Sequence, residues 1–131
     1  MHKGFLLSAA ILGAIAVGLG AFGAHGLKQI VPAETITTFD TGVKYQFYHV
    51  FALFITGILY ASYPVRALRI AGILFLVGIL FFSGSLYALT LLKATGSVGL
   101  GGVGIITPIG GLFFIAGWLS LFWGIWKSKT N

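Results

Sequence analysis

Residues 70–92 read IAGILFLVGILFFSGSLYALTLL and contain no charged side chain. An α-helix rises about 1.5 Å per residue, so roughly 20 apolar residues cross the ~30 Å hydrocarbon core of a bilayer. Arg69 precedes this run and Lys93 follows it, which is typical where a transmembrane helix meets the headgroup layers. The stretch therefore predicts a membrane-crossing helix over residues 67–92.

The same pattern occurs three more times along the chain, between Lys3 and Lys28, between Lys44 and Arg66, and between Lys93 and Lys127. We therefore expect four transmembrane helices, over residues 4–26, 43–63, 67–92 and 107–126. The chain is 58% hydrophobic and 8% charged, whereas a soluble domain carries about 25% charged residues. We expect a single membrane domain over residues 1–131, with the all-α fold of an integral membrane four-helix bundle.

The polar segment 27–44 joins the first two predicted helices. Pro32 suits the first turn of a helix, and Glu34 would lie near the positive end of its dipole. These residues predict a short interfacial helix over residues 32–41. Pro64 disfavours helix in the residue before it, so the second transmembrane helix is expected to end at residue 63.

Residues 94–106 contain five glycines and no charge, and we expect them to form a flexible loop. Thr107 suits an N-cap, with Pro108 at the first helical position. The last predicted helix therefore starts there and runs to residue 126.

Small residues indicate where helices approach one another closely. The first helix contains the ladders Ala10/Ala14/Gly18 and Ala16/Gly20/Ala24, which let a neighbouring backbone come near. Because small residues cover nearly all its faces, we expect protein rather than lipid around this helix, which is too long for a signal-peptide core. The glycines expected at helix contacts are Gly18, Gly20, Gly23, Gly84, Gly110, Gly117 and Gly124.

The net charge of +6 and the absence of cysteine exclude several classes. The basic residues stand singly or in pairs at segment ends, where they contact lipid headgroups, so no nucleic acid partner is expected. Without cysteine there are no disulfides or thiolate metal sites. The lipid bilayer is the expected partner, and a membrane protein partner or a homo-oligomer remains open.

The basic residues also predict an orientation. With four crossings, five lie on the side of the two termini and three on the other, at Lys28, Lys44 and Lys93. The positive-inside rule then places both termini in the cytoplasm of a cell (plasma or inner) membrane.

Polar residues gather in the outer half of this arrangement. His25 ends the first helix, and His49 is expected one to two turns inside the second. At 1.5 Å per residue, all the polar residues of this outer half would lie within roughly 15 Å of the outer boundary. The candidate ligand-binding residues are His25, Tyr45, Gln46, His49, Ser83, Ser85, Tyr87 and Thr107.

Buried ionisable residues in a membrane are functional candidates because they are costly to bury. Neutral imidazoles at His25 and His49 suit a metal, a haem, a quinone or a proton relay. A purely structural role, in which they tie helix ends together, is the alternative. Two histidines without a nearby carboxylate or cysteine make an incomplete metal shell, so no metal site is predicted. Nothing resembles a Ser-His-Asp arrangement, and we assign no catalytic residue and no cofactor.

Four ordered blocks resemble the signature of domain-of-unknown-function family 423, which are small multi-pass bacterial membrane proteins with a eukaryotic relative called transmembrane protein 256. The blocks are GAFGAHG at 20–26, Tyr45-Gln46 with His49, FSGSLY at 82–87 and TPIGG at 107–111. The resemblance implies a multi-pass membrane protein of this size and implies no activity.

Three functions stay open. The first is a structural or accessory protein that binds a lipid, a quinone or a membrane partner at the outer cluster. The second is a small transporter, although the acids that such exporters use for coupling lie here in the polar segment 27–44. The third is a haem or quinone redox protein that uses the two histidines.

Overall fold

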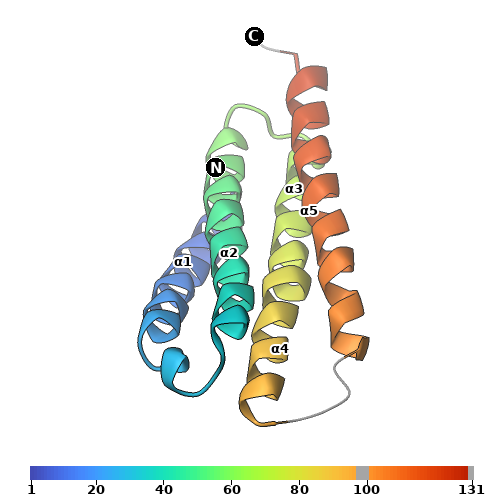
Figure 1. Ribbon diagram of the computed structural model, residues 1–131. Helices are drawn as coiled ribbons and strands as arrows, with labels where there is room; N and C mark the ends of the chain where they lie inside the picture. Colours follow the sequence, from blue (N-terminus) through green and yellow to red (C-terminus); the bar gives the residue numbers. More distant parts are fainter. Residues whose placement is uncertain (97–100, 130–131) are drawn as a thin grey trace.

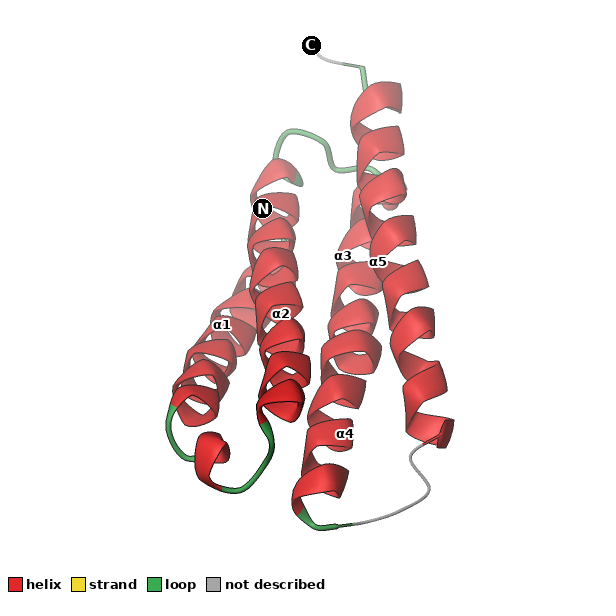
Figure 2. Ribbon diagram, viewed as in Figure 1, coloured by secondary structure: helices red, strands yellow, loops and turns green. Residues whose placement is uncertain are grey.

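The computed structural model describes residues 1–96 and 101–129, and all regular elements in these ranges are helical (Figures 1 and 2). The α-helices are α1 (Lys3–Ala24), α2 (Ala33–Leu59), α3 (Arg66–Gly78), α4 (Gly84–Ala94) and α5 (Gly101–Lys127). Two short elements are the 3₁₀-helix η1 (Leu27–Gln29) and the π-helix η2 (Ile79–Ser83). Because η2 joins α3 to α4 without a break, residues 66–94 form one rod. The predicted all-α four-helix bundle is confirmed.

The chain runs up and down between two ends (Figure 1). Both termini lie at one end, which we call the terminal end, and η1 lies at the other, which we call the connection end. α1 packs mainly on α2, and α5 packs mainly on the 66–94 rod. α2 packs against both α1 and the rod, so it occupies the interior of the bundle.

α2 differs from the prediction because it absorbs the expected interfacial helix. Instead of separate helices over 32–41 and 43–63, one helix runs from Ala33 to Leu59 after the N-cap Pro32. Gly42 does not interrupt it. A Cβ there would lie 2.9 Å from the Tyr87 ring, so this glycine serves the close approach of α4. The only short helix between α1 and α2 in the described residues is η1.

α5 also begins earlier than predicted. It starts at Gly101, whereas residues 97–100 of the expected loop lie outside the described residues. Thr107 is therefore not an N-cap, and Pro108 lies inside the helix. Proline has no amide hydrogen and leaves one helical carbonyl without its usual donor.

The expectation that α1 is surrounded by protein is wrong for this chain. Its buried residues are Phe5, Ala9, Ala16 and Gly23, which form one face toward α2. The ladder Ala10/Ala14/Gly18 is exposed, and a Cβ at Gly18 would meet nothing within 4 Å. Small residues permit close packing on any face, and only the partner helix decides which face is used.

Within the described residues, three helical segments are long and apolar enough to cross a membrane: Lys3–Gln29, Arg66–Ala94 and Gly102–Lys127. α2 is the more polar one, because Glu34, Asp40 and Lys44 lie in its first half. Its buried position between α1 and the rod supplies the protein contacts that such a helix needs. A fourth crossing by α2 remains a prediction.

Single cysteines test this crossing, because the chain has none of its own. Gln29→Cys lies at the connection end and Ser62→Cys follows α2, and both positions are exposed. If α2 crosses, a membrane-impermeant maleimide added to intact cells will label only one of the two. Labelling of both variants from the same side of an intact membrane would contradict the crossing.

Candidate functional site

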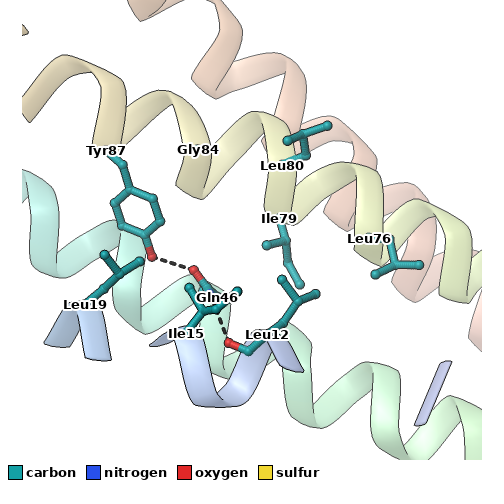
Figure 3. A pocket seen from close by; sticks show the side chains of 9 residues that line it. All are labelled: Leu12, Ile15, Leu19, Gln46, Leu76, Ile79, Leu80, Gly84 and Tyr87. Carbon is teal, nitrogen blue, oxygen red and sulfur yellow. Dashed lines mark hydrogen bonds between the residues drawn. The ribbon is translucent and has the colours of Figure 1, made fainter. Parts of the chain in front are cut away.

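The side-chain amide of Gln46 joins three helices. Gln46 is 2% exposed. Its Nε2 donates to the Leu12 carbonyl of α1 over 2.8 Å, and its Oε1 accepts from the Tyr87 hydroxyl of α4 over 2.6 Å (Figure 3). Inside a bilayer no water is available to satisfy such groups. The pair therefore holds α1, α2 and α4 in one register.

Serine hydroxyls make further links between helices. Ser83 is fully buried in η2 and donates to the Gly42 carbonyl of α2 over 2.6 Å. Ser85 and Thr107 share a 2.5 Å hydrogen bond between α4 and α5. Nearer the terminal end, Ser120 of α5 donates to the Ala67 carbonyl of α3 over 2.8 Å. These bonds connect α2 and α5 to the rod.

His49 is held in an aromatic setting. It is 4% exposed, and its ring stacks on Phe114 with 3.5 Å between centroids. Nδ1 lies 2.8 Å from the Tyr45 carbonyl, and Nε2 lies 3.1 Å from the indole nitrogen of Trp118. A carbonyl only accepts and an indole N–H only donates, which assigns the imidazole proton to Nδ1. Both ring nitrogens therefore have protein partners.

An apolar hollow opens between α1 and the rod, as Figure 3 shows. Its volume is about 310 Å³, and leucine and isoleucine side chains from both walls surround Gln46, Tyr87 and Gly84. A second apolar hollow of about 220 Å³ shares Leu19 and Tyr87 with the first and reaches the connection end. We call the two together the α1–α4 trough.

A separate groove of about 360 Å³ lies between α2 and α5, and we call it the aromatic groove. Tyr45, Phe82, Phe114 and Trp118 line it together with His49. The Tyr45 and Phe82 rings are 4.6 Å apart between centroids. The Tyr45 ring is 39% exposed, and no hydrogen bond to its hydroxyl occurs among the described residues.

The π-helix η2 contributes to both hollows. Ile79 and Leu80 line the trough, Phe82 lines the aromatic groove, and Ser83 points at α2. A π-turn adds a residue to a helical turn and is frequent at functional sites. Gly110 of α5 lies so close to the Phe82 backbone that a Cβ would overlap it. η2 is thus fixed between α2 and α5.

Seven of the eight predicted site residues fall into four groups rather than one cluster, and His25 lies apart from them. Gln46 pairs with Tyr87, Ser83 binds α2, Ser85 pairs with Thr107, and Tyr45 lies beside His49. Because α2 begins at Ala33, His49 lies about 24 Å along it, deeper than predicted.

The two histidines are not brought together. His25 is exposed at the C-cap of α1. α1 and α2 are aligned by the contact of Gly23 with Phe39, which places His49 roughly 18 Å farther along the bundle than His25. The described residues contain no group of three or more metal-ligand side chains. The structure therefore gives no support to chemistry that needs both imidazoles at one ligand.

Sequence reasoning missed Trp118, which donates to His49, and Phe114, which stacks on it. A signal for Trp118 exists, because an indole N–H inside a bilayer needs a protein acceptor and His49 offers one. Among the glycines, Gly23, Gly110, Gly117 and Gly124 lie against neighbouring helices, and a Cβ at Gly20 would lie 3.5 Å from the Val43 side chain. A Cβ at Gly18 or Gly84 would meet nothing within 4 Å.

Comparisons with known proteins identify relatives along the whole chain. The sequence profile described as "Protein of unknown function (DUF423)" matches residues 19–111. A UPF0382 membrane protein of Haemophilus influenzae is 41% identical over 130 residues, covering 99% of both chains. The UPF0382 membrane protein YwdK of Bacillus subtilis is 39% identical, covering 91% of this chain and 93% of its own. The UPF0382 inner membrane protein YgdD of Escherichia coli is 37% identical, covering 96% and 92%. No solved structure matches the chain.

The Gln46–Tyr87 bond predicts a non-additive pair of substitutions. Gln46→Leu and Tyr87→Phe should each destabilise the bundle by about 0.5–2 kcal/mol, because each leaves its partner unbonded in an apolar surrounding. The double variant should lose less than the sum, since it leaves neither group orphaned. Unfolding in mixed micelles measures all four free energies. Strictly additive losses would show that the bond contributes nothing.

Proposed function

Since this chain belongs to the DUF423 family of membrane proteins, we propose that it is a multi-pass accessory protein that binds a membrane lipid in the α1–α4 trough. The observation that carries the proposal is that the two apolar hollows follow one another along the rod, with Leu19 and Tyr87 lining both. Together they extend from Leu76 to Ala94, which is about 27 Å of helix. That length is close to the hydrocarbon thickness of a bilayer.

The chemistry of the walls supports an alkyl chain as the occupant. The trough is lined almost wholly by aliphatic and aromatic carbon. Gln46 and Tyr87 direct their hydrogen bonds to one another and to Leu12, so they form a polar base without requiring a polar ligand. The 310 Å³ of the first hollow lies at the lower limit of typical ligand sites.

Gly84 provides a direct test. It lines the trough, and the space around a would-be Cβ is empty. Gly84→Leu should therefore fill the trough without disturbing the bundle, and lipid that co-purifies in mild detergent should fall severalfold. Native mass spectrometry of the purified protein gives the number of lipids bound.

Gly18→Leu is the matched control. Gly18 also lies within a helix with open space around its Cβ position, but it is on the exposed face of α1 away from the trough. The control should retain lipid as the parent chain does. Equal lipid retention by the parent, Gly84→Leu and Gly18→Leu would refute binding in the trough.

A second candidate function is binding of a flat ring, such as a quinone head, in the aromatic groove. The observation that favours it is Tyr45, which is partly exposed and whose hydroxyl has no hydrogen bond among the described residues, beside the aromatic walls of the groove. Such a hydroxyl can donate to a ring carbonyl while the ring stacks on Phe82 or Phe114.

Gly111→Leu tests this candidate. Gly111 lines the groove, and a Cβ there would make only ordinary contact with Phe82 at 3.9 Å. If the groove holds a quinone, the parent chain and the control Gly104→Leu will co-purify it and Gly111→Leu will not. Gly104 also has open space at its Cβ position. Absence of quinone from the parent chain in mass spectra would exclude this function.

We also propose that both termini face the cytoplasm. The terminal end carries Lys3, Arg66, Arg69, Lys127 and Lys129, whereas Lys28 and Lys93 lie at the connection end and Lys44 lies about 16 Å along α2. An excess of basic residues favours the cytoplasmic side. In the cysteine-labelling experiment, this orientation makes Gln29→Cys the variant labelled in intact cells.

A further inference from the structure

We infer that the α1–α4 trough selects an anionic phospholipid, whose phosphate is received by Lys28 and Lys93. This inference rests on the proposed lipid binding and adds the class of headgroup. The first observation that supports the inference is the position of the two lysines. The second hollow of the trough ends at Leu27 on η1 and Ala94 on α4. Lys28 follows Leu27 directly, and Lys93 precedes Ala94 directly.

Both lysines are exposed and free to move toward a headgroup. No ion pair to either one occurs in the described residues, and neither has a further contact beyond those described. A lysine stem lies along apolar surface while its ammonium group stays in the polar layer. Each lysine is the sequence neighbour of a residue that lines the end of the trough, so its long stem can bring the ammonium group to a headgroup there.

The acidic residues near the connection end, Glu34 and Asp40, are placed differently from the two lysines. Glu34 is exposed in the first turn of α2, where it complements the helix dipole. Asp40 lies near Gly23 of α1, and it stands four residues before Lys44 on the same helix, a spacing at which opposite charges attract. Neither carboxylate lines the trough. The charged residues next to trough-lining residues are Lys28, Lys93 and Asp40, which follows Phe39, so positive charge is in excess there.

Space for a headgroup exists beside one of these lysines. Lys28 lines a further hollow of about 280 Å³ together with Val31, Ala33 and Ile36. Residues of the connection between α1 and α2 line both this hollow and the second hollow of the trough. A lipid can therefore place its tail against Leu27 and its phosphate beside the neighbouring ammonium group. A zwitterionic headgroup should bind less strongly, because the lysine ammonium groups repel its own cationic group.

The experiment uses the full chain in nanodiscs that contain phosphatidylglycerol and phosphatidylcholine in equal amounts. The protein is then released into mild detergent, and native mass spectrometry measures the ratio of the two lipids bound. We expect phosphatidylglycerol to dominate. A lysine near an anionic lipid contributes about 1 kcal/mol, so Lys28→Gln and Lys93→Gln should each lower the ratio by about fivefold.

Lys127→Gln/Lys129→Gln is the matched control, because it removes the same charge as the double variant Lys28→Gln/Lys93→Gln from the opposite end of the bundle. The control should keep the ratio of the parent chain. If the parent binds both lipids equally, or the lysine variants leave the ratio unchanged, headgroup selection is overturned while lipid binding stands. If Gly84→Leu binds as much lipid as the parent, the trough itself is not the site and both proposals fail.

Discussion

The structure depends on the cost of leaving a buried polar group inside a bilayer without a protein partner. α2 carries most of the buried polar side chains of the described residues, and those of Gln46, His49 and Thr56 are hydrogen-bonded, whereas the Thr35 hydroxyl is not. Such a helix is stable in a membrane only where neighbouring helices meet it on more than one side. Gln46 shows how this is achieved, since one amide takes its partners from α1 and α4. The central position of α2 follows from this constraint.

The other helices pack unevenly, because α2 contacts α1 and the 66–94 rod, while α5 packs mainly on the rod. α1 uses α2 as its main partner, and α5 uses the 66–94 rod. The two sides of the bundle that this leaves open are the α1–α4 trough and the aromatic groove. η2 lies between them and sends side chains to each. Both hollows thus result from the way in which the other helices enclose α2. Aliphatic side chains line most of the trough, whereas aromatic side chains line most of the groove.

The four helices and the polar residues of interest could be predicted from the sequence, because charge spacing and the length needed to cross a bilayer are local properties. The course of α2 could not, since Asp40 and Gly42 resemble a break until Tyr87 of α4 is seen to need the space at Gly42. The packing face of α1 could not be predicted either, because its two small-residue ladders are alike in sequence. The distance between His25 and His49 could not be predicted, because it depends on where α2 begins. The contact of His49 with Trp118 could not be predicted either, because it depends on how α5 lies beside α2.

The functional argument therefore depends on one feature, an apolar trough that stays open to lipid along the rod. An experimental structure of the full chain in lipid nanodiscs tests this feature most directly. We expect elongated density that passes between Leu19 and Tyr87 and ends beside Lys28 and Lys93. A trough that α1 closes by packing onto α4, or that a second copy of the chain fills, would contradict the account.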